Sequence, residues 1–388
     1  MTRVLPKGWE EKTLGEVCSF NRGLTYKKSD EVSLSSNVVL RANNIDLSTN
    51  SLNFDELKYL SPNFEIPADK KVQKDCLLIC TASGSKSHLG KVALIDKDYG
   101  YAFGGFMGLL LPDKFIDSHY LFYALTSKPY FDFVSHLTDG ANINNLKWSQ
   151  LQDFKLIIPP LPEQKRIVEK LDKIFANIDK AKSQTEKNLQ NAKDVFSSYL
   201  NNIFNHPAHN WEEKKLGELC DVLDFRRKPI TRKDRTRGLY PYYGATGIVD
   251  FIDSFLFDEP LLLVGEDGAR WGSGEPCAFI ASGKYWVNNH AHVLKPKNCM
   301  SMQYLVYFLN YSDLTPYITG TTVLKLNQQK LRSISVPSPS LPEQKRIVEK
   351  LDVLQSKTQE LEKIYTQKLK DLEELKQAVL QQAFSGKL

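Results

Sequence analysis

The chain has 388 residues, of which 41% are hydrophobic and 25% charged, so it can form packed cores and is not a disordered chain. Its formal net charge of +5 is mildly basic, which is compatible with a nucleic-acid partner but too small to identify one. Six cysteines without a CxxC pair exclude a disulfide framework and a zinc ribbon, and no apolar run is long enough to cross a membrane.

The N-terminal sequence MTRVLPKGWE lacks the apolar stretch of a signal peptide. Together with the cysteine pattern, this predicts a cytoplasmic protein whose thiols are reduced and buried. At roughly 100–200 residues per domain, the length indicates two to three domains.

Two segments of the chain occur twice. Trp9–Cys18 (WEEKTLGEVC) recurs as Trp211–Cys220 (WEEKKLGELC), and Leu161–Asp172 (LPEQKRIVEKLD) recurs unchanged as Leu341–Asp352. One interpretation is a duplication in which only the packing segments kept their sequence. However, packing tolerates apolar replacements, so identities that include charged residues favour a surface that binds the same partner twice. The candidates for this surface are Glu163, Lys165, Arg166, Lys170, Glu343, Lys345, Arg346 and Lys350.

Between the repeated segments lie two inserts, residues 24–105 and 223–290, whose sequences show no convincing alignment with each other. Short apolar runs bounded by Gly, Asn, Asp and Ser predict strands, and the longer runs Ser118–Leu137 and Met300–Leu314 predict helices, so both halves read as mixed α/β. The predicted strands are Val38–Leu40, Cys76–Thr81, Val92–Ile95, Met107–Leu111, Leu261–Val264, Cys277–Ile280 and His292–Leu294.

A long helix follows each LPEQKRIVEK segment. Pro162 and Pro342 suit the first turn of a helix, and Glu163 and Glu343 suit its positive N-terminal dipole. Apolar residues then recur every three or four positions, as in a coiled coil, and each helix of roughly 40 residues would be about 60 Å long. The first seam is Leu171, Phe175, Ile178, Lys182, Thr185, Leu189, Ala192, Phe196, Tyr199 and Ile203. The second is Ile347, Leu351, Leu354, Thr358, Leu361, Tyr365, Lys368, Leu372, Leu375, Val379 and Gln382.

An unpaired seam of this length would aggregate, so we expect the two helices to pack against each other. Since the two halves are equivalent, the pair should be antiparallel. The predicted fold class is therefore α+β, with two mixed α/β units in a pseudo-twofold arrangement, separated by two long antiparallel coiled-coil helices.

A search for catalytic motifs is negative. Gly84–Lys91 (GSKSHLGK) has one residue too many for a P-loop, and Phe103–Gly108 (FGGFMG) precedes an apolar run instead of opening a helix. The only Pro-Pro pair, Pro159-Pro160, is not in the context of an amino-methyltransferase motif. His290 and His292 could share one face of a strand, and Glu266 with Asp267 forms a carboxylate pair, but neither set has the further ligands of a metal or nuclease site. We predict no catalytic residue and no metal.

The basic segments favour nucleic acid. Arg226–Arg237 (RRKPITRKDRTR) holds seven basic residues and one acid and is followed by tyrosines, which suits a loop that tracks phosphates; a mobile solvated loop is the alternative. Thr81–Lys91 combines Gly and Ser with Lys and His, and Asn and Arg side chains can read base edges. The DNA-binding candidates are Arg41, Asn43, Asn44, Ser85, Lys86, His88, Lys91, Arg226, Arg227, Lys228, Arg232, Lys233, Arg235, Arg237, Tyr242, Tyr243, Asn288, Asn289 and His290.

Two divergent inserts, each followed by LPEQKRIVEKLD and a long helix, resemble the specificity subunit of type I restriction-modification enzymes. The final QQAFSGKL is also similar to that family's usual ending, and the resemblance covers essentially the whole chain. It implies target recognition domains at residues 1–160 and 206–340, and conserved coiled-coil helices at 161–205 and 341–388.

By this resemblance, each target recognition domain would read one half of an asymmetric bipartite DNA sequence. The helices would set the spacer and dock two methyltransferase subunits, through which restriction subunits join. The chain itself would be non-catalytic, and S-adenosylmethionine, ATP and magnesium would belong to the partners. Two alternatives remain: a solitary sequence-specific DNA-binding protein of the same architecture, and a DNA nuclease or methyltransferase with an unrecognised site.

Overall fold

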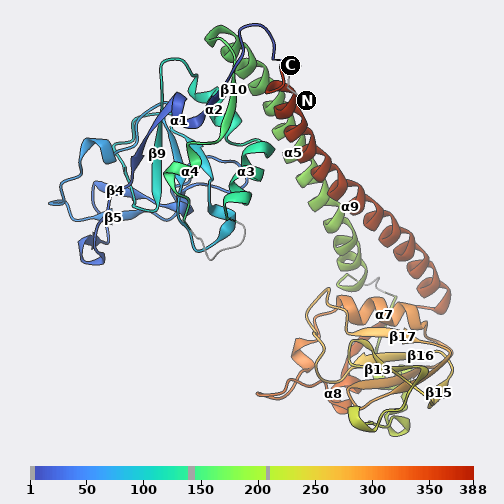
Figure 1. The fold of residues 1–388 in the computed structure, drawn as a ribbon. Coiled ribbons are helices and arrows are strands. Elements are labelled where there is room, and N and C mark those ends of the chain that lie inside the picture. Colours follow the sequence, from blue (N-terminus) through green and yellow to red (C-terminus); the bar gives the residue numbers. More distant parts are fainter. Residues whose placement is uncertain (1–4, 139–144, 207–209) are drawn as a thin grey trace. The chain divides into compact units, whose positions relative to one another are not determined.

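The computed structural model describes residues 5–138, 145–206 and 210–388 and divides into two compact units. The first unit holds Met1–Gln184 and Lys368–Leu388, and the second holds Thr185–Gln367 (Figure 1). The boundaries fall within the two long helices, so each unit contains one insert and a part of each helix. Among the described residues, no helix is long and apolar enough to span a membrane.

The first unit contains two four-stranded sheets and one strand pair, in the orders β2-β9-β6-β7, β3-β5-β4-β8 and β1-β10. Three helices, α2, α3 and α4, follow the sheets. The strands are β1 Glu10–Thr13, β2 Cys18–Arg22, β3 Glu31–Val32, β4 Asn37–Leu40, β5 Lys58–Leu60, β6 Leu77–Cys80, β7 Val92–Leu94, β8 Ala102–Phe103, β9 Met107–Pro112 and β10 Lys155–Ile158. The helices are α1 Leu14–Val17, α2 Ser118–Ala124, α3 Lys128–Thr138 and α4 Trp148–Leu151.

The second unit has the same set of sheets, in the orders β12-β19-β16-β17, β14-β13-β18-β15 and β11-β20. Its strands are β11 Glu212–Lys215, β12 Cys220–Val222, β13 Arg237–Gly244, β14 Gly247–Ile252, β15 Phe257–Asp258, β16 Leu261–Gly265, β17 Ala278–Ala281, β18 Lys284–Val287, β19 Ala291–Pro296 and β20 Ser335–Ser338. Its short helices are α6 Leu216–Leu219, α7 Met302–Tyr311 and α8 Gln328–Ser333.

The two inserts share a backbone plan that their sequences do not reveal. In the first unit β4 runs parallel to β8, with Leu40 opposite Phe103, and in the second β13 runs parallel to β18, with Tyr243 opposite Val287. In both units the central strand of the other sheet, β6 or β16, is antiparallel to both of its neighbours. The mixed α/β prediction is therefore confirmed.

Every predicted strand is present to within a residue or two, but one predicted helix is wrong. Ser118–Leu137 is not continuous, because α2 ends at Ala124 and α3 starts at Lys128. Pro129 explains the break: proline is favoured in the first turn of a helix and disrupts a helix interior. The hairpin β13–β14 was not predicted, since its first strand contains Pro241 and proline argues against a strand.

The long helices are α5, Leu161–Phe204, and α9, Leu341–Ala383. Both start where the proline and glutamate predicted the first turn. In the first unit their segments are antiparallel: Lys376 Nζ lies 5.1 Å from the centre of the Phe175 ring, and Lys170, earlier in α5, donates to the carbonyl of Leu388. Apolar residues of both helices enter the core of each unit, which stabilises the pairing.

The predicted seam of α5 is confirmed, since all its positions are buried or half-buried. The seam of α9 is partly wrong, because Leu361, Lys368, Leu375 and Gln382 are exposed. The neighbouring positions 362, 369, 376 and 383 face inward instead. The prediction placed apolar residues such as Leu361 in the seam and rejected charged neighbours such as Glu362. Long charged side chains, such as that of Lys376, can nevertheless cover a seam with their aliphatic stems.

The prediction of buried thiols is confirmed for five of the six cysteines, which are buried and free. Cys299 is also free but exposed. Burial raises the pKa of Cys18, Cys220 and Cys277 to about 12, so these thiols are unreactive core residues.

Candidate nucleic-acid interface

Four loops of the first unit meet at one end of its sheets. They follow β2, β4 and β6 and connect β8 to β9, and together they line a hollow of about 750 Å³. Backbone hydrogen bonds fix their positions: the amide of Gly104 donates to Leu40, and the amide of Thr81 donates to Phe106. The lining includes Arg41, Asn43, Ser85 and His88, which the sequence had proposed as DNA-binding candidates.

Two polar atoms in this hollow have no hydrogen-bond partner in the part of the chain that the structure describes. The Nε atom of Arg41 and the Nδ1 atom of His88 are buried without a hydrogen-bond partner among the described residues. Burial, followed by the charge of Lys91, lowers the pKa of His88 below its usual value, which favours the neutral ring. Asn43 donates to Glu56 at 3.2 Å. The hollow therefore offers unsatisfied donors and acceptors to a polar ligand.

The other candidates of the first unit divide into exposed and interior residues. Ser85 and Lys86 are exposed. Asn44 is fully buried: its side chain accepts from Arg41 N and donates to the carbonyls of Asn53 and Glu56. Lys91 is 3% exposed and donates to Ile45 O, and burial lowers the pKa of its ammonium group. Asn44 and Lys91 thus support the loop that carries Arg41 and Asn43.

In the second unit the corresponding loops also meet at one end of the sheets. The amide of Asn288 donates to Tyr243, and the amide of Glu266 donates to His290, at positions equivalent to Gly104 with Leu40 and Thr81 with Phe106. Asn288 is buried, whereas Asn289 and His290 are exposed at the turn between β18 and β19.

Some basic side chains of the segment Arg226–Arg237 form ion pairs within the second unit, and others do not. Arg226 pairs with Glu259 at 3.1 Å and lies over the ring of Phe257. Arg235 pairs with Asp250 at 3.0 Å and lies over the ring of Tyr242. Lys228, Arg232, Lys233 and Arg237 are exposed, and no ion pair is found for them among the described residues. These four side chains are available to phosphates.

The two aromatic candidates, Tyr242 and Tyr243, have structural roles in the second unit. Tyr242 is 1% exposed, and its hydroxyl accepts from the amide of Ile230. Tyr243 is half-buried and packs against the rings of Phe279 and Tyr285. Both tyrosines fix the strand β13, at whose first residue the basic segment ends.

A buried charge cluster lies beneath this surface. Arg227 contacts Glu266 at 2.5 Å and Asp224 at 3.5 Å, and Lys325 contacts Glu266 at 2.7 Å. Both ring nitrogens of His292 face oxygen atoms, one of Asp224 and one of Leu326, each at 2.6 Å. Asp224, Glu266 and His292 are close enough to hold a metal, but their side chains are only 7, 8 and 0% exposed, and neighbouring cations already balance their charges. We assign the cluster a structural role.

The repeated LPEQKRIVEKLD segments contain both interior and exposed side chains. Gln164 and Gln344 are buried, and Asp172 and Asp352 accept hydrogen bonds from Tyr123 and Tyr307. The proposed partner-binding residues are less buried: Glu163 pairs with Arg166 and Glu343 with Arg346 within the helix, while Lys165, Lys170, Lys345 and Lys350 are exposed. Interior packing therefore explains only a part of the sequence identity between the two copies of the segment.

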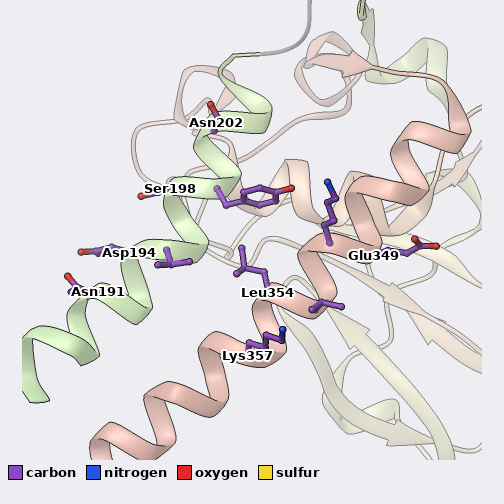
Figure 2. Close-up of a pocket in the computed structure, with 11 residues that line it drawn as sticks. Asn191, Asp194, Ser198, Asn202, Glu349, Leu354 and Lys357 are labelled. Atoms are coloured by element: carbon purple, nitrogen blue, oxygen red, sulfur yellow. The ribbon is translucent and has the colours of Figure 1, made fainter.

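A groove of about 1070 Å³ lies between α5 and α9 within the second unit (Figure 2). Apolar side chains line it, among them Val195 and Val353, which are 48% and 55% exposed. Asp194, Lys350 and Lys357 add charges to the lining. Solvent-exposed valines beside the repeated segment mark this groove as a candidate protein-binding surface.

The chain contains two repeated α/β units that long helices connect, and each unit has a cluster of loops at one end of its sheets. These features define a class of duplicated recognition proteins. The chain belongs to the type I restriction modification DNA specificity domain family, whose model matches residues 6–191 and 208–371.

Relatives in this family are specificity subunits. The chain is 27% identical over 421 aligned positions to the StySPI specificity subunit of Salmonella potsdam, covering 99% of this chain and 90% of the relative. It is 34% identical over 186 positions to the EcoKI specificity subunit of Escherichia coli K12, covering 47% of this chain and 39% of the relative.

Solved structures share the fold. One from a study of complex assembly and conformational transition of the type I R-M system has a TM-score of 0.80 at 20% identity, covering 99% of this chain and 100% of that one. The HsdS subunit of Thermoanaerobacter tengcongensis has a TM-score of 0.64 at 20% identity, with 99% and 98% covered.

Proposed function

We propose that the chain is the non-catalytic subunit that gives a type I restriction-modification enzyme its DNA sequence specificity. Each unit reads one half of an asymmetric bipartite target through its loop cluster. The observation that carries this proposal is that one backbone plan presents different residues at equivalent places of the two units: Arg41 and Gly105 in the first correspond to Gly244 and Asn289 in the second. Different side chains at equivalent places suit two different half-sites.

Phosphate contacts supply the sequence-independent part of the affinity. The exposed residues Lys228, Arg232, Lys233 and Arg237 are suited to this role, because exposed cations release counterions from DNA when they bind. Lys86 adds a further cation beside the hollow of the first unit.

The repeated helical segments dock two methyltransferase subunits, one for each copy of the segment. The exposed identical residues Lys165 and Lys345 support this proposal, and the apolar groove beside Lys350 provides a second element of the contact. Restriction subunits join through the methyltransferase subunits. S-adenosylmethionine, ATP and magnesium act in those partners, and we propose that the complex works in the cytoplasm.

The length of the helices sets the spacer between the half-sites. α5 has 44 residues and α9 has 43, and both pass from one unit into the other. We propose residues 1–160 and 206–340 as the target recognition domains, and 161–205 and 341–388 as the conserved helices.

The test is co-expression of the full chain with the methyltransferase subunit from the same genome, followed by long-read methylation mapping. The expected result is an asymmetric bipartite motif that is methylated on both strands only when this chain is present. If the complex forms and no new methylation appears, the proposal is wrong, and a solitary DNA-binding protein becomes the better interpretation.

A further inference from the structure

The turn that joins β8 to β9 corresponds residue by residue to the turn that joins β18 to β19. The carbonyl of Phe106 accepts from the amide of Thr81, and the carbonyl of His290 accepts from the amide of Glu266. The amides two residues earlier, of Gly104 and Asn288, donate to the ends of β4 and β13. Phe106 and His290 therefore occupy the same place in the two loop clusters.

The backbone of Phe106 is fixed while its side chain is not covered. Its carbonyl oxygen accepts three hydrogen bonds, from Thr81 N at 2.9 Å, Ala82 N at 3.0 Å and Thr81 Oγ1 at 3.0 Å. The side chain is nevertheless 71% exposed. A ligand that covers such an exposed ring removes apolar surface from water, which favours binding. Phe106 lines the same hollow as Arg41 and His88, so this ligand meets the ring and the polar groups together.

His290 is held in a similar manner but offers different chemistry. Its amide donates to Asn288 Oδ1 at 2.8 Å, and its Nδ1 atom contacts the carboxylate of Asp267. Because Nδ1 is engaged, Nε2 is the ring atom that remains for a ligand. The side chain is 52% exposed.

We propose that positions 106 and 290 determine specificity in the two half-sites, an inference that rests on the proposed function. Phe106 makes an apolar contact with the methyl group of a thymine, the one apolar group that a base pair presents in the major groove. His290 makes a hydrogen bond to a base edge through Nε2. The sequence had included His290 among the candidates, but it gave no sign of Phe106, which read as part of a failed glycine-rich motif.

The test uses the full chain in complex with its methyltransferase subunit and a library of duplexes with randomised half-sites. Phe106→Ala should reduce the preference for thymine at one position of one half-site by about tenfold, the size of a single base-pair contact. Replacing that thymine by uracil, which lacks the methyl group, should weaken wild-type binding by a similar factor and leave Phe106→Ala binding unchanged. His290→Ala should alter one position of the other half-site only.

Phe115→Ala is the matched control. Phe115 is 63% exposed in the same unit but lies before α2, where its carbonyl accepts from Gln164. This variant should keep the wild-type preference. The inference is overturned if Phe106→Ala, with an unchanged melting temperature, keeps every base preference of the wild type. A wild-type complex without any bipartite preference would overturn the proposed function itself, which is a distinguishable result.

Discussion

The side-chain amide of Gln164 makes three hydrogen bonds to backbone groups in the first unit, and the side-chain amide of Gln344 makes the same three in the second. Gln164 accepts from Asp117 N at 2.7 Å and donates to Phe115 O at 3.0 Å and Pro159 O at 2.8 Å. Gln344 accepts from Ser301 N at 2.8 Å and donates to the carbonyls of Cys299 and Pro339 at 3.0 and 2.8 Å. Each glutamine thus fastens the start of a long helix to the loop before α2 or α7.

Replacing either glutamine should destabilise its unit. Gln164→Ala removes the partner of three backbone groups, of which the carbonyl of Pro159 is in a fully buried bond. An unsatisfied buried group costs about 1–3 kcal/mol, so a loss of about 2 kcal/mol is expected. Urea unfolding of the full chain measures the loss. Lys165→Ala, one residue further on the exposed side, is the control and should change stability by less than about 0.5 kcal/mol. Equal stability of the two variants would contradict the role assigned to Gln164.

The exposed lysines of the repeat should act in association and not in folding. Lys165→Glu together with Lys345→Glu should weaken binding of the methyltransferase subunit by at least about tenfold, since a reversed charge leaves an unfavourable pair at the interface. The melting temperature should stay the same, because both side chains are exposed. Co-purification and titration calorimetry measure the effect. Lys173→Glu, exposed on α5 outside the repeated segment, should bind normally.

The sequence predicted correctly the elements that depend on a local residue pattern. It did not predict the features that depend on contacts between residues far apart in the chain. Apolar runs located the strands, and proline with glutamate located the starts of α5 and α9. Nothing local showed that Arg227 reaches the buried carboxylate of Glu266, so a structural side chain was grouped with phosphate-binding ones. Likewise, the equivalence of Phe106 and His290 exists only in backbone hydrogen bonds, which different side chains can support equally well.

The basic segment of the second unit should therefore divide into two functional groups. Arg232→Ala and Lys233→Ala should each weaken DNA binding similarly for all sequences and reduce the slope of log affinity against log salt by about 1. Arg227→Ala should instead lower stability, because it leaves Glu266 and Asp224 with less positive charge nearby. Binding measured at several salt concentrations separates the groups. An unchanged slope for Arg232→Ala and Lys233→Ala would exclude them as phosphate contacts.

The buried cluster should make the second unit sensitive to acid. Burial tends to raise the pKa of Asp224, but the hydrogen bond and charge of His292, with Val293 N and Arg227, outweigh it and place the pKa below the usual 3.8. A carboxyl whose pKa is lower in the folded state contributes stability above its unfolded pKa and loses it as pH falls through the folded value. The contribution of Asp224 is therefore present above the unfolded pKa of about 4 and is lost progressively as the pH falls from there through the lower folded pKa.

Asp224→Asn tests this expectation. The variant should be less stable than the wild type by about 3 kcal/mol at neutral pH, because one partner of a buried ion cluster is removed. The difference should shrink as pH falls below about 4, where the wild type loses the same interaction. Denaturant unfolding across this range measures both effects. Asp221→Asn, an exposed carboxylate on β12, should show neither of them.

The last prediction concerns the distance between the half-sites. Seven residues inserted in α5 near Lys182, matched by seven in α9 at the unit boundary after Gln367, preserve the heptad register on both helices. At 1.5 Å per residue they lengthen each helix by about 10 Å, which equals about three base pairs at 3.4 Å each. The methylated motif should then keep both half-sites and gain about three base pairs of spacer, which methylation mapping detects directly. The same insertion in α5 alone shifts its seam against α9 and should lower stability instead. If the doubly extended chain still directs methylation to the original spacer, the helices do not determine it.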